Sequence, residues 1–268
     1  RHPTDGEEIR PGVIYVAPPD QHMLFTPRCV ELMRGPRENH ARPSVDPLFR
    51  SAAVHWRDRA IGVVLTGDLD DGTAGLAAIK ACGGTAIVQD PDSAFQPSMP
   101  ASALANVAVD HCLPLGAIAA VLARQVAHSG SIAHFVPERL LREKAVFEGV
   151  DPIENLAAVA RPSTLMCPDC GGSLWELNEE RPLRYRCHTG HAFTARTLES
   201  LQSQVTEHAM WSSVRSLKER ELLLRRLAAV SRATGDEHQA HAGEAEAERL
   251  ASQIKTMIQL IEGEAASA

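Results

Sequence analysis

The chain reads Ile61-Gly-Val-Val-Leu-Thr-Gly-Asp-Leu-Asp-Asp-Gly-Thr-Ala-Gly-Leu76 at the point that decides its fold class. An apolar run typical of a buried strand leads into an acidic turn punctuated by Gly67 and Gly72, and a helix-compatible segment follows. Ligands of open α/β sheets bind at the carboxyl ends of the parallel strands, so this turn is where chemistry is expected. The candidate residues in it are Asp68, Asp70 and Asp71.

Strand-like and helix-like segments alternate around this stretch, which predicts class α/β with a doubly wound parallel sheet, partial in this chain. The predicted strands are 62–66, 85–88 and 111–113, and the predicted helices are 46–56, 73–82, one ending at 107, and 115–128. Ser44 is a predicted side-chain cap for the first helix.

Two more apolar runs lie near the amino terminus. Residues 9–17 are strand-like, Pro18-Pro19-Asp20 favours a turn, and a second run spans residues 22–25. We therefore expect a short β unit at this end of the chain.

Composition excludes some classes of protein. The chain has 268 residues, 44% of them apolar, and a net charge of −7. This charge argues against a nucleic-acid partner, because such binding rests on neutralising phosphates. No apolar stretch reaches the roughly 18 residues that a membrane span requires, and no signal peptide is recognisable, so we expect a cytoplasmic protein. The sequence starts with Arg1, and we expect it to be a fragment or a processed product.

The second half divides into three parts. We predict a linker with a docking helix over residues 129–162, a zinc ribbon over 163–196 and a helical hairpin over 197–264. Residues 137–147 form the docking helix, and a looser segment follows it up to residue 162. The hairpin is predicted from apolar residues at helical spacing in two segments, which are separated by the helix-breaking stretch Ala233-Thr-Gly-Asp236.

Three of the six cysteines have the spacing of metal ligands. Cys167 and Cys170 form a CxxC knuckle, and Cys187 is followed four residues later by His191. Tetrahedral Zn²⁺ takes four such ligands, which makes this a closed, structural site without catalysis by the metal. His188 also lies nearby, and a disulfide with a spare thiol or a redox use of the thiols is the alternative. The other cysteines, expected to be buried free thiols, are Cys29, Cys82 and Cys112.

Residues 5–128 contain a series of motifs that resembles one family, the catalytic domain of the CheB-type chemotaxis protein-glutamate methylesterases. The matching stretches are Asp5-Gly-Glu, Pro11 through His22, Arg42-Pro-Ser-Val-Asp46, Gly67-Asp-Leu-Asp-Asp-Gly72 and Ser98-Met-Pro100. The resemblance implies a hydrolase that cleaves glutamate methyl esters on chemoreceptors with a Ser-His-Asp triad. The ribbon and hairpin resemble an extension that some members carry.

Residue-level matching places Asp71 at the triad aspartate, where it would orient the imidazole of the base. The family's serine and histidine precede the matched part, so we expect residues 1–128 to be the carboxyl-terminal part of the domain and this chain to be inactive alone. The turn has Asp68 where the family commonly has methionine, and Leu69 where it has glycine.

Other interpretations of these residues stay open. The aspartates could hold magnesium or cap the following helix. Ser98, His22 and His40 lie in expected loops that could contact substrate, whereas His55 is expected to pack. Asp46 is expected to interact with the dipole of its helix.

Two hypotheses follow. The first is a methylesterase of a chemotaxis-type two-component signalling system, with a methylated chemoreceptor-type protein as substrate and a receiver domain or a second copy as a further partner. The second is a non-catalytic signalling or scaffold protein that retains the esterase fold and uses the zinc ribbon as an interaction module. Zinc is the only cofactor expected in either.

Overall fold

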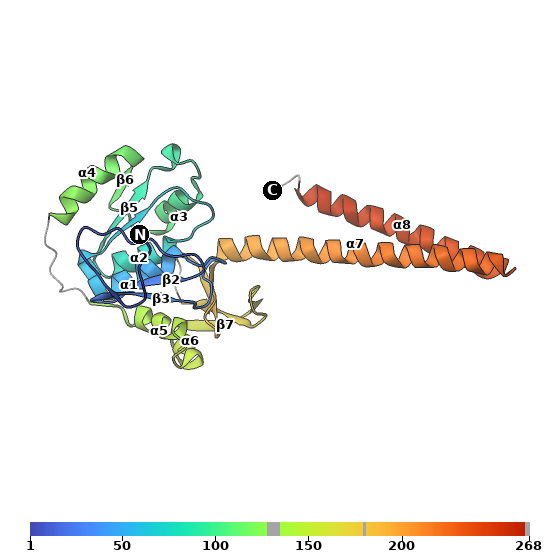
Figure 1. Ribbon diagram of the computed structural model, residues 1–268, viewed down its shortest axis with the longest axis horizontal. Coiled ribbons are helices and arrows are strands. Elements are labelled where there is room, and N and C mark those ends of the chain that lie inside the picture. Colours follow the sequence, from blue (N-terminus) through green and yellow to red (C-terminus); the bar gives the residue numbers. More distant parts are fainter. Residues whose placement is uncertain (128–134, 179–180, 266–268) are drawn as a thin grey trace. The chain divides into compact units, whose positions relative to one another are not determined.

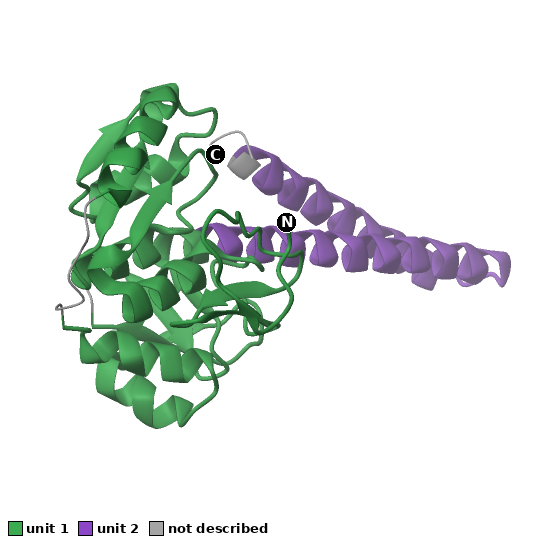
Figure 2. Ribbon diagram, turned by 60° about the vertical axis from the view of Figure 1, so that its left-hand side comes forward, with its two compact units in different colours: residues 1–199 green, residues 200–268 purple. Residues whose placement is uncertain are grey.

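The computed structural model describes residues 1–127, 135–178 and 181–265. It divides into two compact units, residues 1–199 and 200–268 (Figure 2). Unit 1 holds the sheets and the shorter helices, and unit 2 holds most of two long helices (Figure 1). None of the described helices is both long and apolar enough to span a membrane.

The predicted parallel sheet is confirmed. Strands β4 (Ile61–Val64), β5 (Thr85–Gln89) and β6 (His111–Leu113) lie side by side in that order, all parallel. In the described residues β4 pairs only with β5, so it lies at an edge. Buried apolar side chains of β4, β5 and the helices fill the core, among them Val64, Leu76, Val88 and Ala103. The helices of this region are α1 (Val45–Trp56), α2 (Thr73–Ala81), α3 (Ser98–Asn106) and α4 (Leu115–Val126).

The strand predicted over residues 9–17 is wrong. The amino-terminal sheet is antiparallel and consists of β1 (Glu7–Glu8), β3 (Cys29–Met33) and β2 (His22–Phe25), in that order. Residues 9–17 run outside it, with the side chains of Ile14 and Val16 80% and 49% exposed. An apolar run forms a strand only where a neighbouring strand supplies hydrogen-bond partners. Here Ile14 O and Val16 N bond the backbone of Arg1, which belongs to no strand.

Two helices connect to a second antiparallel sheet. Helix α5 (Glu138–Phe147) is followed by α6 (Pro152–Val159), so the segment expected to be loose is helical, with Leu156 fully buried. The sheet has the order β10-β9-β8-β7. Its strands are β7 (Ala160–Met166), β8 (Ser173–Leu177), β9 (Arg184–Cys187) and β10 (Ala192–Thr194). We call residues 160–194 the ribbon.

A buried ion network joins the ribbon to the rest of unit 1. Glu38 accepts hydrogen bonds from Arg50 of α1 and from Arg186 of β9, and Glu143 of α5 forms a two-point pair with Arg184 of β9. All five side chains are at most 6% exposed. Burial alone would raise the pKa of both glutamates, but the arginine charges outweigh it and hold each pKa at about 2.

Unit 2 consists of helix α8 (Glu237–Ala265) and most of α7 (Ala195–Ala233). The helices meet through apolar side chains, and Gly235 adopts a left-handed conformation (φ 84°) between them. The cluster comprises Met210, Val214, Leu217, Ile254, Met257, Ile258 and Ile261.

Candidate functional site

Asp71 lies in the turn after β4, and its carboxylate reaches the amino end of α1. Oδ2 accepts a hydrogen bond from the Val45 amide at 2.7 Å. Backbone N–H groups at a helix amino terminus and the helix dipole both favour a negative charge there. The donors to Oδ1 are Ser44 Oγ at 2.6 Å, Gly72 N at 3.0 Å, and Asn39 Nδ2 and Asp46 N at 3.3 Å each.

This arrangement corrects two predictions about helix caps. Ser44 precedes α1 but makes no side-chain cap bond, because its hydroxyl donates to Asp71, whose carboxylate takes the helix amides instead. The aspartates of the turn do not cap α2 through their side chains either. That helix starts after Gly72, which has φ 86°. The carboxylate of Asp71 thus accepts hydrogen bonds from the amino end of α1, and its partner Val45 lies 26 residues earlier in the sequence.

Asp46 is more than a charge at the start of α1. It is buried, its Oδ1 accepts from Gly75 N at 2.6 Å, and its Oδ2 accepts from Asn39 Nδ2 at 2.9 Å. Because Asn39 also donates to Asp71, one amide holds both carboxyl groups, which we call the carboxyl pair. Burial, with the nearby charge of Asp71, raises the pKa of Asp46 to about 7. Burial also raises the pKa of Asp71, against hydrogen bonds from Ser44 and Val45 that lower it.

The other two aspartates of the turn point elsewhere. Asp70 is buried and accepts from Thr197 Oγ1 at 2.6 Å, whereas Asp68 is exposed and bonds the amide of Leu69. Leu69 has φ 59°, a region that glycine adopts more readily than leucine. The three carboxylates therefore do not converge, which argues against the magnesium alternative.

The serine and histidines weighed as alternatives are placed as follows. His22 is not in a loop: it begins β2 and is fully buried, and burial lowers its pKa. Its Nε2 faces Pro36 O, an acceptor, and its Nδ1 faces Ser44 N, a donor, so the neutral tautomer protonated at Nε2 fits. His40 is exposed and contacts Asp169. Ser98 begins α3 and donates to Leu69 O. None of the described histidines hydrogen-bonds Asp71.

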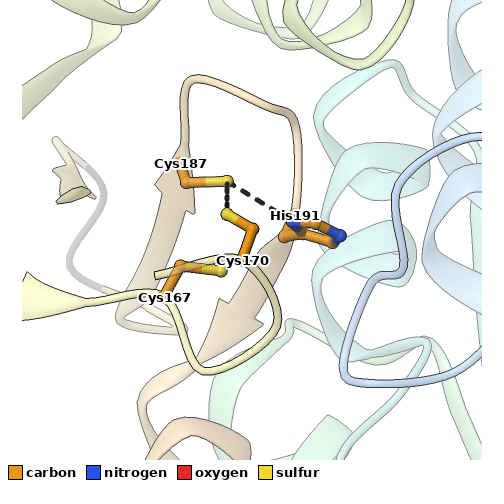
Figure 3. Close-up of side chains that lie close together, drawn as sticks. All are labelled: Cys167, Cys170, Cys187 and His191. Carbon is orange, nitrogen blue, oxygen red and sulfur yellow. Dashed lines mark hydrogen bonds between the residues drawn. The ribbon is translucent and has the colours of Figure 1, made fainter. Parts of the chain in front are cut away.

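The four predicted metal ligands come together at one end of the ribbon (Figure 3). The ligand atoms of Cys167, Cys170, Cys187 and His191 all lie within 4.8 Å of one another, and this is the one such group in the part of the chain that the structure describes. His188 is exposed and lies outside it.

Distances within this Cys/His cluster fit a tetrahedral metal. Zn–S bonds of about 2.3 Å and Zn–N bonds of about 2.0 Å imply separations of about 3.8 Å between sulfurs and about 3.6 Å between sulfur and nitrogen. Cys170 Sγ lies 3.8 Å from Cys187 Sγ, and Cys187 Sγ lies 3.6 Å from His191 Nδ1. Hydrogen bonding by Cys167 and His191 lowers the pKa of Cys187 to about 3, so this sulfur is disposed to be a thiolate. All the cysteines are free, which leaves the disulfide alternative without support.

Three cysteines lie outside the cluster, and the expectation that all are buried is only partly met. Cys82 is buried and Cys29 is partly buried, but Cys112 in β6 is exposed. β6 is a three-residue strand at an edge of the sheet, and none of its residues is buried, so apolar neighbours in the sequence did not ensure burial of Cys112.

Comparison with known proteins identifies the segment that carries Asp71. The family model of the CheB methylesterases matches residues 1–122. Residues 1–122 belong to the CheB methylesterase family. The CheB segment therefore contains the parallel sheet, the carboxyl pair and Asn39, whereas the Cys/His cluster lies beyond it.

Two individual relatives agree with this assignment. A Leptospira interrogans protein is 44% identical over 119 residues, which cover 44% of this chain and 62% of that protein. A Caulobacter vibrioides protein, named protein-glutamate methylesterase/protein-glutamine glutaminase 2, is 44% identical over 129 residues, covering 46% and 37%. The crystal structure of the Thermotoga maritima CheB methylesterase catalytic domain is similar at 33% identity and a TM-score of 0.45, covering 46% of this chain and 68% of that one. The match thus spans less than two thirds of the length of each of the first two relatives.

Sequence reasoning missed two residues of the CheB segment. Asn39 and Glu38 precede Arg42-Pro-Ser-Val-Asp46 in a stretch without periodicity, yet both are buried and contact the ribbon. A Glu-Asn dipeptide in a loop has no pattern that separates it from an exposed turn. Their roles come from tertiary partners, which include ribbon residues more than 140 positions away in the sequence.

Proposed function

We propose that the protein is a protein-glutamate methylesterase of chemotaxis-type signalling, in which Asp71 is the carboxylate that orients the catalytic histidine. The observation that carries the proposal is the place of Asp71 in the CheB segment, in the turn between β4 and α2. Its Oδ1 has four donors, whereas the one hydrogen bond found for Oδ2 in the described residues comes from Val45 N. A carboxylate oxygen has two lone pairs, so Oδ2 can accept an imidazole N–H.

The chemistry follows from that geometry. A serine hydroxyl attacks an ester only when a base removes its proton, and the base needs an acceptor that fixes its tautomer and stabilises its cation. Asp71 is rigidly held and suits the acceptor role. It cannot act as the nucleophile or as the base in this scheme, so the proposal assigns only the orienting carboxylate to this chain. The same chemistry would hydrolyse a glutamine side-chain amide, the second activity in the relatives' names.

Asp71→Asn in the protein expressed from its complete gene tests the assignment. An asparagine in this position would hold the wrong tautomer of the base, and we expect release of methanol from a methylated receptor to fall by about 10⁴-fold. Asp68→Asn is the matched control, because this neighbour is exposed, and its turnover should stay near normal. Near-normal turnover by Asp71→Asn would exclude the assignment.

The competing function is a non-catalytic signalling scaffold. It is favoured by the donors that Asp71 already has within the fold, since a carboxylate that holds the start of α1 needs no catalytic role. Absence of ester and amide hydrolysis by the complete protein, with the fold intact, would support this alternative.

A scaffold that binds a second copy of itself would show the mass of a dimer in light scattering.

We also propose that the Cys/His cluster holds a structural zinc ion. Cys167, Cys170, Cys187 and His191 would supply four ligands, and a bound Zn²⁺ would neutralise the thiolates and close the ribbon. With all four positions filled by side chains, no position is open to water or substrate. The site would therefore stabilise the ribbon rather than react.

A further inference from the structure

The side chain of Asn39 connects the ribbon to the carboxyl pair. Its Oδ1 accepts a hydrogen bond from the amide of Thr194 in β10 at 3.1 Å. Its Nδ2 donates to Asp46 at 2.9 Å and to Asp71 at 3.3 Å. This orientation of the amide is the one that satisfies both sides, because Thr194 offers a donor and the carboxylates offer acceptors. Asn39 is 8% exposed, so water competes little for these bonds.

The backbone around Asn39 is also attached to the ribbon. Asn39 N donates to Ala192 O at 2.8 Å, and Ala192 N donates to Arg37 O at 3.3 Å. Asn39 has φ 50°, a left-handed conformation that asparagine tolerates better than most residues. Ala192 directly follows His191 of the Cys/His cluster. The position of Asn39 is therefore set by the part of β10 next to the predicted metal ligand.

We propose that Asn39 is a positioning residue through which the docked ribbon fixes the orientation of Asp71. Among the described residues, it is the one whose side chain hydrogen-bonds both Asp71 and the ribbon. The remaining donors to Asp71, such as Ser44 and Val45, belong to the CheB segment itself. The inference rests on the proposed function, because the orientation of Asp71 matters to turnover only if Asp71 holds an imidazole.

The ribbon is thereby part of the support of the candidate active site rather than an independent module. Loss of its fold would remove the Thr194 N–H that donates to Asn39 and the backbone bonds with Ala192 that hold this loop. Asn39 could then no longer be held as a donor to each carboxylate. The other charged groups that face the pair are Glu38, Arg50 and Arg184, which all belong to the buried ion network that includes Arg186. Changes in the ribbon can therefore reach Asp71 and Asp46 through two adjacent residues of one loop.

Two substitutions of Asn39 separate its contacts. Asn39→Asp keeps an acceptor for Thr194 N and tolerates the left-handed backbone, but it replaces the donor to the carboxyl pair with a third carboxylate. Asn39→Gly tolerates the backbone and deletes both contacts. Ser44→Ala is the matched control, since it removes a donor to Asp71 without touching the ribbon.

The readouts are hydrogen exchange at the Thr194 amide and a ¹³C-carboxyl NMR titration of Asp46 and Asp71, both on zinc-loaded chains of residues 1–268. Asn39→Gly should speed exchange at Thr194 by about tenfold, the value of one hydrogen bond, and shift the titration of the pair upward. Asn39→Asp should shift the titration upward with exchange unchanged. Ser44→Ala should shift the titration of Asp71 upward with exchange unchanged.

The proposal is overturned if the titration of the carboxyl pair in Asn39→Asp superimposes on that of the unmodified chain. The Asn39→Asp variant tests the proposal by itself, so the test does not depend on whether Asn39→Gly folds. In the complete protein, Asn39→Asp should lower kcat by up to about a hundredfold with KM unchanged, and move the acid limb of the pH profile upward. If the complete protein hydrolyses no ester, the proposed function fails, while the NMR and exchange results still decide whether Asn39 positions the pair.

Discussion

Arg186 of the ribbon donates a hydrogen bond to Glu38 of the CheB segment at 2.8 Å, although 148 residues separate them in the sequence. Arg186 is 0% and Glu38 1% exposed. A buried ion pair contributes little compared with a well-packed apolar pair, but removal of one partner leaves a buried charge without compensation. The two segments lie in one compact unit, and this pair is one of the contacts between them. Its contribution can be measured by removing one partner.

Glu38→Gln should therefore destabilise unit 1 by about 3–5 kcal/mol, because Arg186 and Arg50 would lose the carboxylate to which both donate hydrogen bonds. Denaturant unfolding followed by tryptophan fluorescence measures this. A Trp211→Phe background limits the signal to Trp56 and Trp175 of unit 1.

Glu148→Gln is the control for this measurement. Glu148 forms an i,i+4 pair with Lys144 near the surface, so the change should stay within about 1 kcal/mol. Equal effects of the two substitutions would show that the Glu38 network does not hold the ribbon.

The same network predicts sensitivity to acid. Glu38 and Glu143 have a pKa of about 2 in the folded protein against an ordinary 4.5, so the unfolded chain binds their protons first as the pH falls. Their contribution is complete above about pH 4.5 and is lost between pH 4.5 and 2. Urea midpoints measured across this range should fall with pH, and Glu143→Gln should flatten the decline. An unchanged slope in that variant would contradict the assigned pKa.

The raised pKa of Asp46 predicts the opposite pH dependence of stability, with a loss as the pH rises. Its pKa of about 7 lies above the ordinary 3.8, so the folded protein retains a proton that the unfolded chain has released. Stability from this group is complete below about pH 3.8 and declines as the pH rises through 7. Asp46→Asn should remove the decline between pH 4 and 7, whereas Asp92→Asn on the surface should retain it. Identical pH profiles for the two variants would refute the prediction.

Zinc removal should destabilise the ribbon and, with it, unit 1. We expect one zinc ion per chain by elemental analysis. Chelation of this ion should expose the three cysteine thiols of the Cys/His cluster to a thiol reagent. His191→Ala should weaken zinc binding, and His188→Ala should not. Cys112→Ser serves as the control for the exposed thiol outside the cluster. Zinc loss in His188→Ala with retention in His191→Ala would reverse the choice of ligand.

Local sequence patterns predicted the parallel sheet well. The run from Ile61 to Leu65, the Gly-rich turn and the following helix are specified by residues that are neighbours in the chain, as are the spacings of the Cys/His cluster. Local sequence patterns gave wrong predictions where the structure depends on a hydrogen-bond partner that is distant in the sequence. Residues 9–17 are apolar enough for a strand but have no neighbouring strand, and Ser44 precedes a helix but donates its hydroxyl to Asp71.

The sequence by itself determined the α/β class, the CheB segment, the position of Asp71 after a buried strand and the ligand types of the cluster, because periodicity and motif spacing record these locally. Only the tertiary structure decided that Asp71 holds the start of α1, that Asp46 shares Asn39 with it, and that the ribbon reaches both through Thr194. The physical reason is that a buried polar side chain takes its role from whichever partner satisfies it, and here those partners come from distant parts of the chain.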